Sequence, residues 1–315
     1  MIMVVIVHVA NYYCRAFRTI DRSSFFGAVC FNAVSRISVP IFFMISGACL
    51  LEKPYDAVKN RRRIKRTAVV LAAFTTLYFF WDKYYLHKNI KWKTLLKSPE
   101  RKSLWFLYAI IGIYIALPFI KRMVDSLNPR EEKLGIVLWA LLNGVFKKIG
   151  ISACYAVPIL DGTYYLGYFI LGHLAVKYAG KIVQKKKDRI LLTAFSGSVL
   201  FMTVGTYFAS IALGRYTGIL LTYSNLLTMT ASLSGFLFMY FHVGDCERKV
   251  IMNFSYLSFG IYLTHGFILD FFMKNFPYHQ INAWIGVPLV SVTVVILSGI
   301  LVGLCKKTNL LKRLL

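Results

Sequence analysis

Polar side chains that could do chemistry share one face of the first apolar segment of this sequence. They recur at positions i, i+3, i+4 and i+7, as His8, Asn11, Tyr12 and Arg15. This spacing places all four on the same face of a helix. A neutral imidazole, with an ordinary pKa of about 6.5, can accept a proton at physiological pH. His8 is therefore a candidate general base that would activate a hydroxyl group.

Two other apolar segments carry ionisable groups. One holds Arg36, and the other holds a second polar stripe at helical spacing, formed by Ser255, Ser258, Tyr262 and His265. At about 1.5 Å per residue, His8 lies roughly 10 Å below the outer membrane surface, Arg36 roughly 8 Å and His265 roughly 15 Å. Ionisable groups at membrane depth are costly, so these three predict one shared, hydrated cavity.

In that cavity Arg36 and His265 are candidates to stabilise a developing oxyanion or to orient the base. A structural interpretation competes with this one. Histidines in helix bundles often make interhelical hydrogen bonds, and Arg36 could extend to the lipid headgroups.

A run of basic residues opens the third apolar segment and includes Arg63 and Arg66. Guanidinium groups and free backbone N–H groups at a helix N-terminus suit a phosphorylated ligand. Basic residues also anchor a membrane helix on its cytoplasmic side. The sequence leaves both interpretations open.

The segments that position these residues are long and apolar. Hydrophobic residues make up 57% of the chain and charged residues 16%, whereas a soluble protein has about a quarter of its residues charged. A spanning helix needs about 20 mostly apolar residues. This criterion predicts ten segments: Met1–Arg15, Phe31–Leu51, Thr67–Leu86, Leu104–Ile120, Leu134–Phe146, Gly162–Tyr178, Ile190–Leu213, Thr222–Val243, Asn253–Phe276 and Trp284–Cys305.

The predicted fold is therefore all-α, a polytopic membrane bundle of about ten transmembrane helices. We expect residues 1–315 to form a single membrane domain. The first segment begins at Met1 in mid-pattern, so we also expect the helix to start upstream of this residue.

The net charge of +25 has a membrane explanation, because the basic residues gather between the apolar segments. With alternating sides, one side receives 23 Lys and Arg residues and the other 14. The richer side is expected to be cytoplasmic, which places both termini there and makes anionic membrane lipids, not nucleic acid, the partners of the charge. The segment 83–102 is an exception, since it carries seven basic residues on the poorer side.

The six cysteines show neither Cys-x-x-Cys nor Cys/His spacing, so no metal site is predicted. Cys14 and Cys30 flank the same loop. They are either isolated thiols or a pair in an oxidising space.

Several stretches, in order along the chain, resemble acyltransferase family 3 of bacterial membrane acyltransferases. They are Val4-Val5-Ile6-Val7-His8, Ser38-Val39-Pro40-Ile41-Phe42-Phe43-Met44-Ile45-Ser46-Gly47, Arg62-Arg63-Ile64-Lys65-Arg66, Leu104-Trp105-Phe106-Leu107-Tyr108, Tyr165-Leu166-Gly167-Tyr168-Phe169-Ile170-Leu171-Gly172 and Ser258-Phe259-Gly260-Ile261-Tyr262-Leu263-Thr264-His265.

The resemblance implies about ten helices and transfer of an acyl group, usually acetyl from acetyl-CoA, to extracytoplasmic glycans. The family's first helix carries an Arg, ten residues and a His; the His matches His8, and the Arg would precede Met1. The family's Arg-x-x-Arg motif matches Arg63 and Arg66, whereas a His common before the Leu-Trp-Phe-Leu segment is Ser103 here.

Together these features predict a multi-pass O-acyltransferase of the bacterial cell membrane. It would move an acyl group from acyl-CoA to a hydroxyl of a cell-envelope glycan or lipid-linked sugar, without a metal. Arg63 and Arg66 would hold the CoA phosphates. An exporter or flippase of a polysaccharide or lipid-linked sugar remains the alternative, and a non-catalytic sensor or anchor is a third. The sequence does not identify the acceptor, the acyl group or the oligomeric state.

Overall fold

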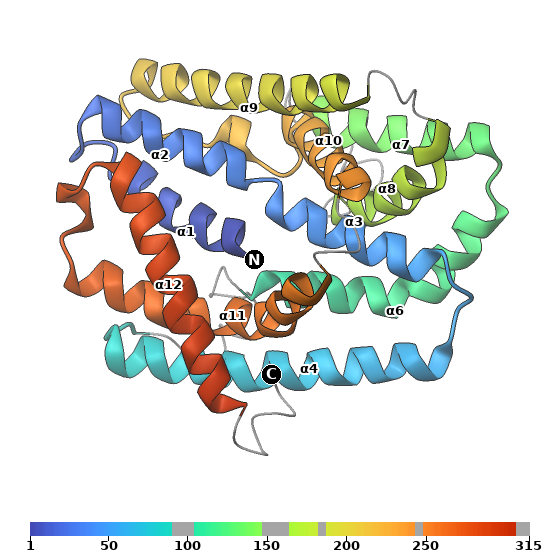
Figure 1. The fold of residues 1–315 in the computed structure, drawn as a ribbon, viewed down its shortest axis with the longest axis horizontal. Coiled ribbons are helices and arrows are strands. Elements are labelled where there is room, and N and C mark those ends of the chain that lie inside the picture. Colours follow the sequence, from blue (N-terminus) through green and yellow to red (C-terminus); the bar gives the residue numbers. More distant parts are fainter. Residues whose placement is uncertain (90–103, 147–163, 182–186, 243–247, 307–315) are drawn as a thin grey trace.

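The computed structural model describes residues 1–89, 104–146, 164–181, 187–242 and 248–306 (Figure 1). Within these ranges every regular element is helical, which confirms the predicted all-α class. The α-helices are α1 (Ile2–Arg15), α2 (Arg22–Ser35), α3 (Ser38–Leu51), α4 (Ala57–Phe80), α6 (Trp105–Ser126), α7 (Pro129–Leu141), α8 (Tyr164–Tyr178), α9 (Lys187–Ala212), α10 (Leu226–His242), α11 (Arg248–Asn275) and α12 (Ala283–Cys305). Single π-helical turns extend α4 over Trp81–Tyr85 and α7 over Leu142–Phe146.

Short polar side chains set the starts of several helices. The Asp21 carboxylate accepts the backbone N–H of Ser24 at the start of α2, and Asn282 caps α12 in a similar way. Asn128 forms a reciprocal capping box with Glu131 at the start of α7. Each cap satisfies N–H groups that have no partner within the helix.

Among the described residues, five helical segments are long and apolar enough to cross a membrane: Arg22–Leu51, Ala57–Tyr85, Trp105–Ser126, Lys187–Ala212 and Ala283–Lys306. Two further apolar helices, α1 and α10, are shorter. Ten separate spans are therefore not confirmed by length and composition, and that number stays a prediction.

The predicted second segment, Phe31–Leu51, is wrong in its start and in its continuity. The helical segment begins at Arg22 and breaks into α2 and α3 between Ser35 and Ser38. Pro40 explains the break, because a proline has no N–H for the carbonyl of the residue four positions earlier and its ring clashes with that carbonyl. The residue four positions before Pro40 is Arg36, so the break places Arg36 at the corner between two helices.

The helices form one bundle in which α9 and α4 run along opposite edges and α1, α2 and α3 lie between them (Figure 1). Helix α1 packs against α2 and α12, α4 packs against α6, and α11 packs against α12. The N-terminus lies in the interior of the bundle. Helix α1 therefore brings its polar face to the middle of the molecule.

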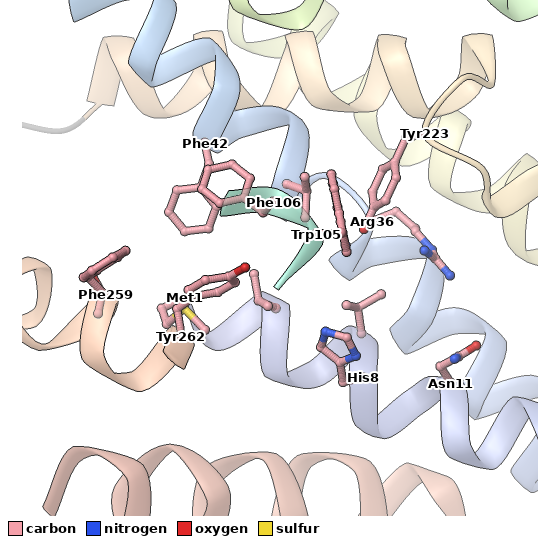
Figure 2. Close-up of a pocket in the computed structure, with 14 residues that line it drawn as sticks. Met1, His8, Asn11, Arg36, Phe42, Trp105, Phe106, Tyr223, Phe259 and Tyr262 are labelled. Atoms are coloured by element: carbon pink, nitrogen blue, oxygen red, sulfur yellow. The ribbon is translucent and has the colours of Figure 1, made fainter. Parts of the chain in front are cut away.

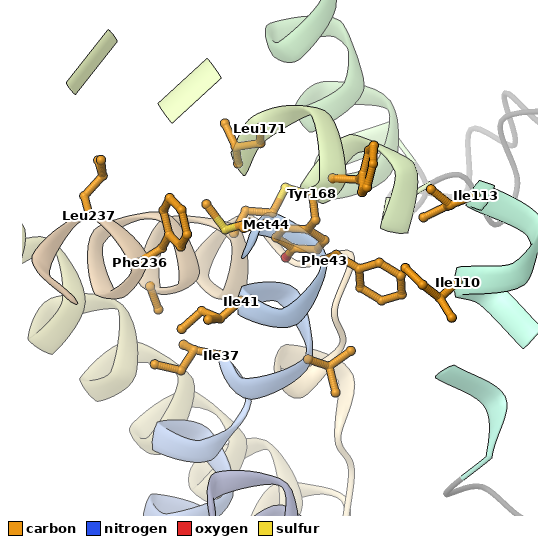
Figure 3. Close-up of a cluster of buried hydrophobic side chains, with 14 of the residues drawn as sticks. Ile37, Ile41, Phe43, Met44, Ile110, Ile113, Tyr168, Leu171, Phe236 and Leu237 are labelled. Atoms are coloured by element: carbon orange, nitrogen blue, oxygen red, sulfur yellow. The ribbon is translucent and has the colours of Figure 1, made fainter. Parts of the chain in front are cut away.

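Helices α3 and α8 pack closely against each other within a large buried cluster (Figure 3). A Cβ atom built on Gly47 would lie 1.7 Å from the Phe169 carbonyl oxygen, and one on Gly172 would lie 2.1 Å from the Met44 carbonyl oxygen. Only glycine allows these backbones to approach so closely. Two of the segments that carry the family resemblance thus form a packing contact.

Candidate active site

A cavity of about 290 Å³ lies where α1, the α2–α3 break, α6 and α11 meet (Figure 2). Its lining combines four polar side chains, His8, Asn11, Arg36 and Ser258, with an aromatic wall. The lining residues are Met1, Val4, Val7, His8, Asn11, Arg36, Val39, Phe42, Trp105, Phe106, Tyr223, Ser258, Phe259 and Tyr262.

The structure brings His8 and His265 together. Their ring centroids are 5.3 Å apart, with an angle of 41° between the ring planes. His8 is half-buried and lines the cavity, whereas His265 is only 1% exposed and lies behind it. His265 Nδ1 is 2.6 Å from the carbonyl oxygen of Tyr262. A carbonyl only accepts, so Nδ1 carries the hydrogen and the tautomer of His265 is fixed by its own helix.

Arg36 is held in place by a residue of α2. Its Nε donates to the Asn32 side-chain oxygen at 2.9 Å, and its guanidinium carbon lies 5.5 Å from the centre of the Tyr223 ring. Asn32 is fully buried, and its amide nitrogen contacts the Cys14 sulfur at 3.6 Å. Arg36 lines the cavity together with His8 and Asn11 (Figure 2).

The electrostatic character of the cavity is basic. Of the described residues that line it, none is acidic, and the charges of Arg36 and Arg15 act on His8. A cavity with fixed positive groups and no carboxylate suits a negative charge that develops during a reaction.

The two predicted polar stripes are only partly in the cavity. Asn11 lines it with His8, but the Tyr12 hydroxyl donates to Asp270 at 3.4 Å and Arg15 is exposed. In α11, Ser258 and Tyr262 line the cavity. The side chain of Ser255 lies outside the described residues, as does Ser103.

Sequence reasoning missed part of the wall. Trp105 and Phe106 were given no place in the site from the sequence, but both line the cavity, and Trp105 stacks on Tyr165 with ring centroids 4.6 Å apart. Tyr223 lies in the irregular segment before α10, where helical spacing gives no signal. The adjacent Trp105 and Phe106 within a family-like segment were the available clue.

Arg63 and Arg66 are not among the residues that line this cavity. They lie in the first part of α4, where Arg63 is half-buried and Arg66 is exposed. The Asp56 carboxylate caps this helix. Hydrogen bonds from the backbone N–H and the ammonium of Lys59 hold the pKa of Asp56 below its ordinary value. The helix start thus already has one anionic partner, and Arg63 and Arg66 lie about two to three turns further along.

No group of three or more His, Cys, Asp or Glu residues that could hold a metal ion occurs in the part of the chain that the structure describes. Within that same part, Cys14 and Cys30 are both free thiols.

Comparison with known proteins yields one match. A family model described as an acyltransferase domain matches residues 1–303. No curated protein and no solved structure matches the chain. Because the family match covers nearly the whole sequence, and several of its helices are long and apolar enough to cross a membrane, the chain belongs to acyltransferase family 3 and is an integral membrane protein.

Proposed function

We propose that this protein is a multi-pass O-acyltransferase that moves an acyl group, acetyl in the first instance, from acyl-CoA to a hydroxyl of a cell-envelope glycan. The observation that carries the proposal is the cavity that both His8 and Arg36 line, with the ring centroid of His265 5.3 Å from that of His8. Family membership supports the acyl-transfer class. Residues 1–315 would act as one domain, with about ten spans and both termini cytoplasmic.

His8 acts as the general base in this proposal. It removes the proton from the acceptor hydroxyl as the oxygen attacks the thioester carbonyl carbon. A C–O bond forms, and the carbonyl oxygen becomes an oxyanion. When the tetrahedral intermediate collapses, the C–S bond breaks and the CoA thiolate leaves. The proton held on His8 passes to that thiolate, which restores the neutral imidazole.

Arg36 stabilises the oxyanion, since its guanidinium is held by Asn32 before the reaction begins. His265 acts as a positioning residue. Its Nδ1 hydrogen is committed to the helix backbone, which fixes the ring plane beside His8.

The aromatic wall supports a sugar as the acceptor, because the apolar faces of sugar rings pack on aromatic side chains while their hydroxyls face polar groups. Trp105 and Tyr223 would provide that surface. Arg63 and Arg66 would hold the CoA phosphates at the cytoplasmic end of α4. Arg63 and Arg66 do not line the His8 cavity. The pantetheine arm of CoA would therefore have to extend from the start of α4 to this cavity.

The experiment is transfer of radiolabelled acetyl from acetyl-CoA to envelope glycan in membranes that contain the protein. We expect label that remains with the purified glycan and is released by mild alkali, as an ester would be. Membranes that contain the His8→Ala variant serve as the matched control. Movement of glycan across the membrane without any label would contradict the proposal and favour the exporter or flippase.

A further inference from the structure

A second hollow lies between α4, α11 and α12, on the other side of α11 from the His8 cavity. It measures about 600 Å³, and its lining includes Ala73, Leu77, Trp81, Phe267 and Leu301. Thr264 lines this groove, whereas the next residue, His265, faces His8. One helix therefore separates the two spaces.

The wall between them is rigid. Tyr78 stacks on Phe267 with ring centroids 4.0 Å apart and an interplanar angle of 9°, and its hydroxyl donates to the Leu263 carbonyl oxygen at 2.9 Å. These contacts tie α4 to α11. The groove is thus a feature of the packed bundle.

The shape and chemistry of the groove fit a hydrocarbon chain. It follows α4 from Ala73 to Tyr85, a length of roughly 18 Å at about 1.5 Å per residue. Its walls are apolar and aromatic, and several of its residues are exposed, including Leu77, Phe80 and Tyr84. In a membrane, such a surface is covered by lipid tails.

Positive charge gathers at the Tyr85 end of the groove. The Lys274 ammonium donates to the Tyr85 carbonyl oxygen at 2.5 Å and lies 4.4 Å from the centre of the Tyr85 ring. The Lys83 ammonium lies 5.4 Å from the centre of the Tyr84 ring and is exposed. The buried carboxylate in this region, Asp82, already pairs with Lys88 at 3.2 Å.

Two lysines therefore face the end of an apolar groove without an acidic partner among the described residues. Lys83 and Lys88 also begin the basic segment 83–102 that does not fit the positive-inside pattern. Residues 90–102 of this segment lie outside the described part. A lysine near a membrane surface attracts anionic headgroups with about 1 kcal/mol, or about fivefold in affinity.

We infer that this groove binds a membrane lipid with an anionic phosphate headgroup, whose chain lies along α4 while its phosphate contacts Lys83 and Lys274. The site is distinct from the proposed acyl-transfer site. It requires neither acyl-CoA nor a glycan, so it can fail or hold independently of the proposed function.

Trp81 in the groove provides the readout. The purified protein is placed in phosphatidylcholine nanodiscs with increasing fractions of brominated phosphatidylglycerol or brominated phosphatidylcholine, since bromine quenches nearby tryptophan fluorescence. The Trp81→Phe variant gives the signal of the other tryptophans, which is subtracted. We expect half-quenching at a several-fold lower fraction of the anionic lipid.

Two pairs of variants locate the site. Lys83→Gln and Lys274→Gln should each lower the preference for the anionic lipid about fivefold, whereas Lys133→Gln on α7 should leave it unchanged. Ala73→Phe fills the groove and should reduce quenching by both lipids, whereas Ala72→Phe, on an exposed position outside the lining, should not.

Equal quenching by the two lipids in the wild-type protein would overturn the inference, as would a preference that survives both lysine substitutions. The lysine variants change only exposed side chains. They therefore keep the test decisive even if Ala73→Phe fails to fold.

Discussion

The His8 cavity and the Glu132 cluster, formed by Glu132, Lys177 and Tyr178, both contain charged groups. The charge is paired in the cluster, whereas the cavity holds a positive group with a neutral partner. Glu132, on α7, is 2% exposed and accepts from the Lys177 ammonium and the Tyr178 hydroxyl, each at 2.6 Å. Arg36 has a neutral partner, Asn32, and lines a cavity without a carboxylate among its described residues.

The difference separates a structural role from a chemical one. A buried charge that is paired and hydrogen-bonded holds helices together. A positive group that is fixed by a neutral partner and faces an empty volume can instead meet a charge that the substrate develops. The following predictions test whether this distinction holds.

The largest effect should come from His8. Replacement by glutamine, which keeps hydrogen bonding but cannot accept the proton, should lower the transfer rate about 10² to 10⁴-fold. The measurement is ester formation per amount of folded protein. His279→Gln changes an exposed histidine outside the cavity and should keep the wild-type rate. An equal loss of transfer rate in His8→Gln and His279→Gln would contradict a catalytic role for the cavity histidine.

Arg36 should be the next most sensitive position. Arg36→Ala should reduce kcat about 10² to 10³-fold, because it removes an oxyanion donor. Asn32→Ala should act through Arg36, with a smaller loss in kcat and an unchanged KM for the acyl donor. If the double variant loses no more than Arg36→Ala alone, the two residues act as one unit. Additive losses would contradict a positioning role for Asn32.

Glu132 should show the opposite behaviour. Glu132→Gln should lower the free energy of unfolding by about 1 to 3 kcal/mol, because the amide cannot accept both donors. The rate of transfer per folded molecule should stay at the wild-type level. Thermal unfolding in detergent gives the first quantity and the transfer assay gives the second. A loss of rate without a loss of stability would blur the distinction between the two regions.

The smallest effect should come from the basic run of α4. Arg63→Gln together with Arg66→Gln should raise the KM for acetyl-CoA about tenfold, since charge-assisted contacts to phosphate each contribute of the order of 1 kcal/mol or more. The kcat should not change. Arg61→Gln, an exposed position in the same run, is the matched control. An unchanged KM in the double variant would assign the run to membrane anchoring.

Helical spacing predicted the parts of the fold and site that depend on one segment at a time. The spacing predicted that His8 and Asn11 share one helical face, and both line the cavity. It also predicted that His265 lies on a helix with Ser258 and Tyr262, and this helix is α11. The cost of ionisable groups at membrane depth predicted one shared, hydrated cavity for His8, Arg36 and His265. His8 and Arg36 line one cavity, whereas His265 is buried beside His8 and is not part of the lining. That expectation rests on general energetics and needs no knowledge of the helix order.

The parts that sequence reasoning missed depend on contacts between segments. Tyr223 reaches Arg36 from the segment before α10, and no spacing rule links those two positions. Asn32 lies four residues before Arg36, a helical spacing that was present in the sequence but was not used. Pro40 indicated a helix break near Arg36. The apolar sequence on both sides of Arg36 nevertheless predicted one continuous span. The separation of Arg63 and Arg66 from the cavity lining also follows from the packing of α4, not from its sequence.

The most direct test of the account is chemical rescue of the His8→Ala variant by free imidazole in the labelled acetyl transfer assay. Removing the His8 ring enlarges a cavity of about 290 Å³, so a small base can take its place. The account predicts that transfer is nearly abolished in this variant and rises with imidazole concentration, while Arg36→Ala shows no such rise. Transfer by His8→Ala at the wild-type rate without imidazole would contradict the central claim that His8 is the general base.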